Sequence, residues 1–272
     1  MVTTKMEPAF WWLFTDLDGT LIPHETCRSE NSADLMQLSE LLSHENGGLV
    51  FVTGRHLRSA LEAKEQFQLP TPSYIICDVG TTIAERSNGK WQVSSAYRDY
   101  LADQTTGWSS NQLFERLKLG PETYFQEKEK QGQFKISLYT PARTLNTTVC
   151  ELQDQIEKLE APYSTVASVD PFTGDGLIDF LPRDVDKGSA ARWLAAELEI
   201  PFTESVIFSG DSGNDTAAIT SGCKAILVAN ADRQLATSVA QTMQNAGVRD
   251  KLFLATRPAT SGVLEGLKHF LR

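Results

Sequence analysis

Two aspartates near the start of the chain have side chains that could serve as nucleophile, acid, base or metal ligand. Asp16 and Asp18 directly follow the apolar run 11–15, which predicts a buried strand, and Gly19 predicts a chain reversal after it. Both carboxylates are therefore expected at the carboxyl end of a strand, where open α/β sheets bind ligands. Because such close like charges repel, a divalent metal or a shared proton is expected between them. The alternative is an ordinary acidic turn.

A threonine and a lysine further along the chain could bind phosphate oxygens. Thr53 and Gly54 follow the apolar run 49–52, and a hydroxyl beside close backbone amides can contact a phosphate. A plain strand-to-helix turn with Thr53 as N-cap is the alternative. Lys187 opens a predicted helix, where a cation is mildly unfavourable for the helix dipole. Its amine is therefore expected to reach a phosphate or a carboxylate, unless it is a solvated surface lysine.

A second pair of aspartates follows the apolar run 205–209. Asp211 and Asp215 are four residues apart around a glycine-containing corner. One carboxylate could ligate a metal while the other orients water or Lys187. Oxygen ligands beside a phosphate favour Mg²⁺, which takes one or two carboxylates and keeps several waters.

Composition limits the partners of this 272-residue chain. Its net charge of −10 argues against a general nucleic-acid surface or an acidic membrane surface, because a polyanion would be repelled. The cysteines are widely scattered, without a Cys-x-x-Cys pair, as expected of reduced thiols in the cytosol. The first residues lack a signal-peptide apolar core, and no uninterrupted apolar stretch reaches about 18 residues. We expect a cytoplasmic protein that binds neither nucleic acid nor membrane.

The chemistry-bearing residues belong to a regular alternation of strands and helices. The apolar runs 11–15, 49–52 and 74–77 are separated by the helix-like segments 33–45 and 57–67. This alternation predicts an α/β fold with a Rossmann-like, doubly wound parallel sheet. The pattern returns at the helix opened by Lys187 and continues with strands at 205–209, 225–228 and 252–255 and a closing helix at 262–271.

Between about residues 83 and 182 the chain is more polar and its pattern changes. The periodicity predicts strands at 134–139, 163–168 and 177–181 and an amphipathic helix at 145–159. These elements indicate an inserted α+β domain rather than another βαβ unit. Its aromatic residues are expected to form the core of the insert rather than a ligand platform: Trp91, Tyr97, Tyr100 and Trp108.

Four segments, taken together and in this order, closely resemble the motifs of haloacid-dehalogenase (HAD) superfamily phosphatases: Asp16-Leu17-Asp18-Gly19-Thr20, Thr53-Gly54-Arg55, Lys187, and Gly210-Asp211-Ser212-Gly213-Asn214-Asp215. The insert is similar to the large C2-type cap of that superfamily. Segments 135–137, 179–182, 186–188 and 228–231 look like those of its sucrose-phosphate phosphatase branch. The resemblance implies a phosphatase core formed by residues 1–82 and 186–272 and a cap formed by residues 83–185.

The resemblance implies hydrolysis of a phosphomonoester through an aspartyl-phosphate. Asp16 would attack phosphorus, since a carboxylate is already ionised at neutral pH. Asp18 would protonate the leaving oxygen and then take a proton from the attacking water. Mg²⁺ would be held by Asp16, by the backbone carbonyl of Asp18 and by Asp211, with Asp215 in the metal shell.

The same resemblance implies which groups contact the substrate. Thr53 and Lys187 would hold phosphate oxygens, supported by the Gly54 amide. Asn214 would lie at the substrate site and orient the metal shell or Lys187. The other candidates for contacts with substrate are Arg55, Lys135, Asp175 and Asp179.

The substrate implied is a phosphorylated sugar or glycoside such as sucrose 6-phosphate, and a sugar-phosphate synthase is a possible partner. One alternative is a hexose phosphomutase, which passes phosphate to a sugar instead of water and would yield an isomeric sugar phosphate. A different class is a catalytically silent sugar-phosphate sensor or scaffold. The intact set of Asp16, Asp18, Lys187 and Asp211 counts against a silent protein.

Overall fold

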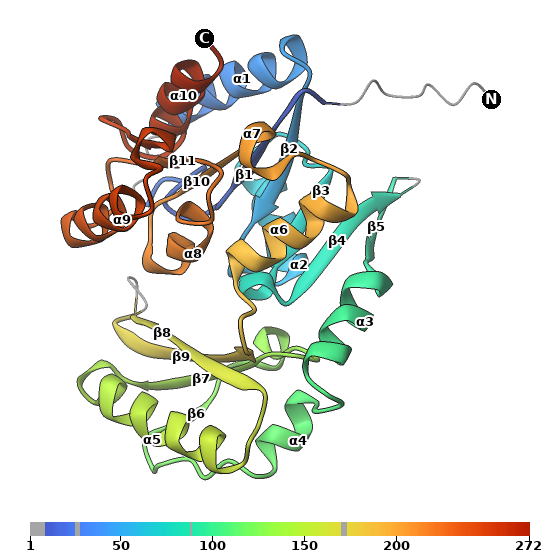
Figure 1. The fold of residues 1–272 in the computed structure, drawn as a ribbon, viewed down its shortest axis with the longest axis vertical. Coiled ribbons are helices and arrows are strands. Elements are labelled where there is room, and N and C mark those ends of the chain that lie inside the picture. The colour runs from blue at the N-terminus through green and yellow to red at the C-terminus, as the bar shows by residue number, and fades with distance from the viewer. Residues whose placement is uncertain (1–8, 25–27, 88, 170–172) are drawn as a thin grey trace.

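The computed structural model describes residues 9–24, 28–87, 89–169 and 173–272 and divides into two lobes (Figure 1). The larger lobe contains an eight-stranded sheet with the order β12-β11-β10-β1-β2-β3-β4-β5. The strands from β12 to β3 pair in parallel, which confirms the predicted doubly wound sheet. The parallel strands are β1 (Trp11–Thr15), β2 (Gly47–Val52), β3 (Tyr74–Cys77), β10 (Val206–Gly210), β11 (Lys224–Leu227) and β12 (Leu252–Leu254).

Helices cover both faces of this sheet because its central strands are apolar on both sides. In β1, Leu13 and Phe14 point to opposite faces, and both side chains are fully buried. Leu13 joins the core under α1 (Arg28–His44), α2 (Leu57–Gln66) and α10 (Ala259–Phe270). Phe14 joins the core under α3 (Ser95–Gln104), α6 (Lys187–Glu197), α7 (Phe202–Ser205), α8 (Thr216–Ile219) and α9 (Arg233–Asn245).

The smaller lobe is the predicted α+β insert. Its antiparallel sheet has the order β6-β7-β9-β8, and α5 packs on one face of it. The lobe has its own apolar core, which includes Leu138, Ile156 and Phe180. Its elements are α4 (Ser110–Phe114), β6 (Tyr124–Phe125), β7 (Ile136–Pro141), α5 (Leu145–Lys158), β8 (Tyr163–Val169) and β9 (Asp175–Pro182).

The boundary expected at residue 83 differs from the structure. Strands β4 (Thr82–Ser87) and β5 (Lys90–Val93) extend the large sheet in antiparallel fashion instead of belonging to the insert. Burial of an apolar side chain explains this placement. Ile83 pairs with Ile76 of β3, and its side chain is buried in the core of the large lobe. The sheet of the insert begins only at β6.

The expected aromatic core of the insert is also divided between the lobes. Tyr97 lies in the core of the large lobe, where its ring centroid is 4.7 Å from that of Trp193. Tyr100 lies beside the same two rings, and Trp91 packs on the opposite face of the sheet. Only Trp108 of the four joins the core of the insert. Aromatic content alone did not reveal which lobe each ring would join.

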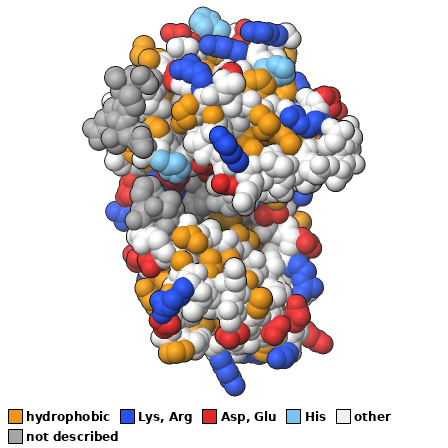
Figure 2. Space-filling view, turned by 90° about the vertical axis from the view of Figure 1, so that its left-hand side faces the viewer, with side chains coloured by type: hydrophobic (Ala, Val, Ile, Leu, Met, Phe, Trp, Pro, Cys, Tyr) orange, Lys and Arg blue, Asp and Glu red, His pale blue; other side chains and the backbone are white. Residues whose placement is uncertain are grey.

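The two lobes meet at a narrower waist, and Figure 2 shows a hollow at that level. In the described part of the chain, every helix is too short or too polar to cross a membrane. The connections through the waist place the carboxyl ends of the parallel strands opposite the sheet of the insert (Figure 1).

Candidate active site

Three neighbouring strands end in polar residues at one edge of the large sheet. Asp211 follows β10, Asp16 follows β1 and Thr53 follows β2, and these strands are adjacent in the order β10-β1-β2. The Asp16 amide donates to the carbonyl of Ser209 at 2.9 Å, which fixes the end of β1 against β10. Parallel pairing thus brings together residues that lie nearly 200 positions apart in the sequence.

Lys187 is the cation at the centre of this edge. Its side chain is fully buried, and Nζ lies 2.9 Å from Asp16 Oδ1 and 2.7 Å from Asp215 Oδ1. Nζ also donates to Asn214 Oδ1 at 2.9 Å. These contacts explain why a lysine begins α6: its amine reaches the two carboxylates while Asp186 caps the helix by accepting from the Ser189 amide at 2.7 Å.

The charges in the cluster shift one another's protonation equilibria. Burial alone lowers the pKa of Lys187, but Asp16 and Asp215 more than offset this effect, so its pKa is raised and the amine stays protonated. Burial raises the pKa of Asp16 well above its ordinary value, Lys187 opposes the rise, and Asp215 and Asp211 add to it. The site therefore holds more negative charge than one lysine neutralises.

Asp215 stabilises the corner after β10 with its second carboxylate oxygen. Oδ2 accepts from the backbone amides of Asp211 and Ser212, both at 3.1 Å, and from the Ser212 hydroxyl at 3.2 Å. A Cβ on Gly210 would lie 2.6 Å from Asp215 Cγ, so only glycine fits there. Both oxygens of Asp215 are thus engaged within the protein, one by Lys187 and one by this corner.

Asp211 is nearly buried and faces the turn that follows Asp16. Its Oδ1 accepts from the Thr20 hydroxyl at 3.3 Å, and its Oδ2 lies 3.4 Å from His24 Nε2. Burial raises the pKa of Asp211, Asp215 raises it further, and His24 opposes both effects. Gly19 has a φ of +79°, and a Cβ at this position would lie 2.1 Å from Asp211 Oδ2. The turn can approach Asp211 this closely only because residue 19 is a glycine.

The geometry fits a small divalent cation. One carboxylate oxygen from each of Asp16, Asp211 and Asp215 lies within 4.8 Å of the other two. Carboxylate oxygens are hard ligands that suit Mg²⁺, and a cation would relieve the repulsion that, in addition to burial, raises the pKa values of Asp16 and Asp211. Asp18, which was expected to contribute only its backbone carbonyl, has no side-chain oxygen in this group.

Asp18 is bound by an arginine instead. Arg55 Nε donates to Asp18 Oδ2 and Nη2 to Oδ1, both at 2.7 Å, while Nη1 donates to Ser59 at 3.1 Å. This bidentate contact fixes the orientation of the carboxylate. Arg55 was expected to contact substrate, and in the structure its guanidinium is engaged with Asp18. Thr53 is fully buried at the end of β2, with its hydroxyl accepting from the Arg55 amide at 3.1 Å.

Lys135 connects the insert to the large lobe. Its side chain is almost completely buried, with Nζ 3.7 Å from Asp78 Oδ1 and 3.9 Å from Asp179 Oδ1. Asp179 also accepts a short hydrogen bond from Ser137. Asp175 is not part of this cluster, because it pairs with Pro141 at the far end of β9. Lys135 and Asp179, both expected near substrate, thus lie together, whereas Asp175 lies apart.

Sequence reasoning missed two polar residues at this edge. Asp78 directly follows β3, in the same way that Asp16 follows β1, and burial raises its pKa while Lys135 opposes the rise. Asn230 follows β11 and donates to Asp211 Oδ2 at 3.1 Å. The position of each residue just after a parallel strand was the available signal. An added Cβ at Gly54 would make an ordinary van der Waals contact with Val79 Cγ2, at 3.9 Å.

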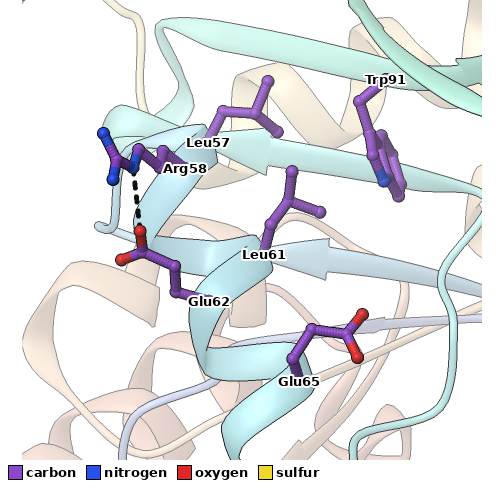
Figure 3. Close-up of a pocket in the computed structure, with 6 residues that line it drawn as sticks. All are labelled: Leu57, Arg58, Leu61, Glu62, Glu65 and Trp91. Carbon is purple, nitrogen blue, oxygen red and sulfur yellow. Dashed lines mark hydrogen bonds and ion pairs between the residues drawn. The ribbon is translucent and has the colours of Figure 1, made fainter.

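A large cavity of about 730 Å³ lies elsewhere, between α2 and β5 (Figure 3). Its centre is apolar, and an ion pair of 2.8 Å joins Arg58 to Glu62 at its rim. None of the strand-end carboxylates reaches it, so size alone does not identify the reactive site. The lining residues are Leu57, Arg58, Leu61, Glu62, Glu65 and Trp91.

Known proteins share sequence similarity with almost the whole of this chain. A family model described as sucrose-6F-phosphate phosphohydrolase matches residues 11–271. A putative HAD-like hydrolase of Nitrosococcus oceani is 30% identical, over 95% of this chain and 71% of that protein. Mannosylfructose-phosphate phosphatase of Agrobacterium fabrum is 29% identical, over 95% of this chain and 96% of that protein.

A solved structure has the same fold across both lobes. The X-ray structure of the sucrose-phosphatase from Synechocystis sp. PCC6803, in complex with sucrose and phosphate, has a TM-score of 0.78 and 23% identity to this chain. The match covers 96% of this chain and 98% of that one, so it includes core and cap. With the family model spanning residues 11–271, the chain belongs to the sucrose-6F-phosphate phosphohydrolase family of HAD phosphatases.

Proposed function

We propose that this chain is a Mg²⁺-dependent phosphatase that hydrolyses a phosphorylated sugar or glycoside through an aspartyl-phosphate. The observation that carries the proposal is the fully buried Lys187, whose amine lies within 3 Å of both Asp16 and Asp215. Burying a lysine between carboxylates costs desolvation energy and is weak evidence for a role in stability. Here these charges lie beside Asp211 at the carboxyl ends of parallel strands, where α/β sheets bind ligands, which supports a role in the reaction. Family membership supports the same reaction class.

Mg²⁺ would be held by Asp16 and Asp211, with the backbone carbonyl of Asp18 beside them. It would supply charge that offsets the repulsion between the nucleophile and an anionic phosphate. Asp215 acts through its hold on Lys187 and the corner after β10, since both of its oxygens are engaged there. The Thr53 hydroxyl orients one equatorial phosphate oxygen, and the Lys187 amine reaches another by giving up one of its three contacts with Asp16, Asp215 and Asn214.

The residues divide the reaction into two steps. An Asp16 oxygen attacks phosphorus, the bond from phosphorus to the sugar oxygen breaks, and Asp18 gives its proton to that oxygen. Asp18 then takes a proton from water, the water oxygen attacks phosphorus, and the Asp16–phosphorus bond breaks to release inorganic phosphate. Asp18 must keep its position through both steps, and Arg55 fixes that position in the structure. Because both Asp18 oxygens accept from Arg55 there, one of the two contacts must break while Asp18 carries the proton.

The insert supplies the polar surface opposite this centre. Lys135 and Asp179 lie at the waist, next to Asp78 of the large lobe, and their charged groups suit the hydroxyls of a sugar. Phosphatases acting on mannosylfructose phosphate and sucrose phosphate are among the relatives, which supports a glycoside over a nucleotide. A sugar-phosphate synthase remains a proposed partner, and a glucosylglycerol-phosphate synthase is 25% identical to this chain over 30% of its own length.

Phosphate release from a panel of substrates tests the proposal. With Mg²⁺ present, we expect sugar and glycoside monophosphates, including sucrose 6-phosphate, glycosylglycerate phosphates and hexose 6-phosphates, to release phosphate faster than nucleotides. Removal of the metal with a chelator should stop the release. An isomeric sugar phosphate as product would indicate a phosphomutase, and a lack of metal-dependent release with every substrate would favour a sensor or scaffold.

Replacement of Arg55 should impair the steps that need Asp18. Because Arg55→Ala removes the bidentate contact, we expect kcat for the sugar phosphate to fall by about 10²-fold, the effect of a misplaced catalytic group. With p-nitrophenyl phosphate, whose leaving group needs no acid, the initial burst of nitrophenolate should persist. Rapid-mixing kinetics with both substrates makes the comparison.

Arg58→Ala is the matched control, since Arg58 is an exposed residue of α2 paired with Glu62. It should behave as the wild type does. Loss of the nitrophenolate burst in Arg55→Ala, together with a raised KM for both substrates, would mean that Arg55 binds the phosphate directly.

A further inference from the structure

The side chain of Asn230 connects three segments that are far apart in the sequence. Asn230 lies in the turn after β11, where Nδ2 donates to the Gly19 carbonyl at 2.9 Å and to Asp211 Oδ2 at 3.1 Å. Its Oδ1 accepts from the Ala259 amide at 2.9 Å, at the start of α10. One amide group thus joins the turn after β1, the carboxylate after β10 and the C-terminal helix.

The partners of Asn230 determine which way its amide points. The Ala259 amide can only donate, so it must face Oδ1. The Gly19 carbonyl can only accept, so it must face Nδ2, and an ionised Asp211 also only accepts. A reversed amide would set oxygen against two oxygens and nitrogen against a donor. The orientation is therefore fixed by chemistry as well as by position.

The segments around Asn230 are themselves held in place. The Val228 amide donates to the backbone carbonyl of Gly210 at 3.2 Å, and the Ala229 amide donates to the backbone carbonyl of Arg257 at 3.1 Å. On the far side, the buried Thr260 hydroxyl donates to the Leu21 carbonyl at 2.9 Å. The first turn of α10 is thus bonded both to the turn after Asp18 and, through Ala259, to Asn230.

The backbone at Ala259 adds a second observation. Its φ is +46°, a left-handed conformation that costs a residue with a Cβ about 1–3 kcal/mol and persists only where its surroundings impose it. That conformation lets the Ala259 amide meet Asn230 Oδ1. The start of α10 is therefore held in an unfavourable geometry by contacts that also orient the amide facing Asp211.

Among the described residues, three side chains hydrogen-bond to the Asp211 carboxylate. Thr20 reaches Oδ1 at 3.3 Å, and His24 lies 3.4 Å from Oδ2. Asn230, at 3.1 Å, is the shortest of these three contacts and the one whose own position is fixed from the opposite side. A carboxylate that must present one oxygen to a cation benefits from a donor that holds the other part of the group.

We propose that Asn230 is a positioning residue that holds the Asp211 carboxylate in the orientation needed to bind Mg²⁺. The hydrogen bonds at the start of α10 in turn hold Asn230 in place. The inference rests on the proposed function, because it assigns Asp211 to the cation. Asn230 lies outside the four motifs, in the segment 228–231, to which the resemblance assigned no role. The inference gives this residue and the C-terminal helix a role at the site. In the described part of the chain, the side-chain hydrogen bonds of Asn230 go to Gly19, Asp211 and Ala259 and to neither Asp16 nor Asp18.

Calorimetric titration of metal-free protein with Mg²⁺ tests this role without relying on activity. Asn230→Ala removes all three side-chain hydrogen bonds, and Asn230→Gln keeps an amide but displaces it by one methylene. We expect both variants to bind Mg²⁺ about 10-fold or more weakly, the usual effect of removing a group that orients a metal ligand. The rise in thermal midpoint on adding Mg²⁺ should shrink in parallel.

Asn245→Ala is the matched control, because Asn245 is an exposed residue at the end of α9 whose side chain bonds only to Gln241 among the hydrogen bonds described. It should bind Mg²⁺ as the wild type does. If the Asn230 variants bind Mg²⁺ within about twofold of this control, even with a lowered midpoint for metal-free protein, the positioning role is refuted while the proposed function stands. Wild-type protein that takes up no Mg²⁺ would overturn both.

Discussion

Asp16→Asn is expected to abolish turnover while leaving the fold intact. Asparagine keeps the shape of the side chain and an oxygen for the Lys187 amine at 2.9 Å, but its amide is a poor nucleophile. Loss of a covalent nucleophile commonly costs at least about 10⁴-fold in kcat, so we expect phosphate release near the background rate. Because burial already raises the pKa of Asp16, removing its charge should not destabilise the metal-free protein.

Steady-state phosphate release and thermal unfolding of the same preparations check this prediction. Asp154→Asn, at an exposed position of α5, makes the same chemical change far from the site and should retain wild-type activity. Asp16→Asn protein with near-normal activity would refute the assignment of the nucleophile. A variant that fails to fold would instead show that Asp16 is needed for structure.

Lys187→Met is expected to lower both stability and activity. Methionine has a similar length, but it leaves Asp16 and Asp215 buried without their common cation. Removing one partner from a buried charge cluster costs about 3–5 kcal/mol, and we expect the free energy of unfolding at pH 7 to fall by that amount. The fall in kcat should reach at least about 10²-fold, because a donor to the phosphate is lost as well.

Urea denaturation of metal-free protein measures this effect. Lys158→Met, at the exposed end of α5, is the control for loss of one lysine and should change stability little. The double variant Lys187→Met/Asp215→Asn should be less destabilised than the sum of its single variants, because it removes one of the uncompensated charges. Additive losses would mean that the amine and the carboxylate do not interact as their 2.7 Å distance indicates.

The sequence was sufficient to predict the parallel strands of the large sheet and three of the polar residues at their carboxyl ends. Each parallel strand is a short apolar run, and Asp16, Thr53 and Asp211 come directly after three of them. Since parallel pairing places all carboxyl ends at one edge, their proximity followed from the order of the runs. Lys187 was a candidate for a different reason, because a cation is mildly unfavourable at a helix start and the resembling motifs include a lysine in this place.

The partners of the remaining residues depended on contacts that no local pattern encodes. Arg55 was expected to meet substrate, but the turn after β1 brings Asp18 within reach of its guanidinium. Residues 83–93 are polar enough to resemble the insert, yet Ile83 and its neighbours complete the large sheet. Tyr97 likewise joins the large lobe because Trp193 of α6 lies beside it. Each outcome rests on packing between distant segments.

Chemical identification of the phosphorylated residue tests the central claim most directly. Asp18→Asn protein, given p-nitrophenyl phosphate and Mg²⁺, should accept the phosphoryl group without an acid but lack the base that releases it. After rapid quenching and borohydride reduction, which converts an acyl phosphate to an alcohol, peptide mapping should find the modification at position 16. Modification at another residue, or nitrophenolate released in a burst with residue 16 unmodified, would contradict attack by Asp16.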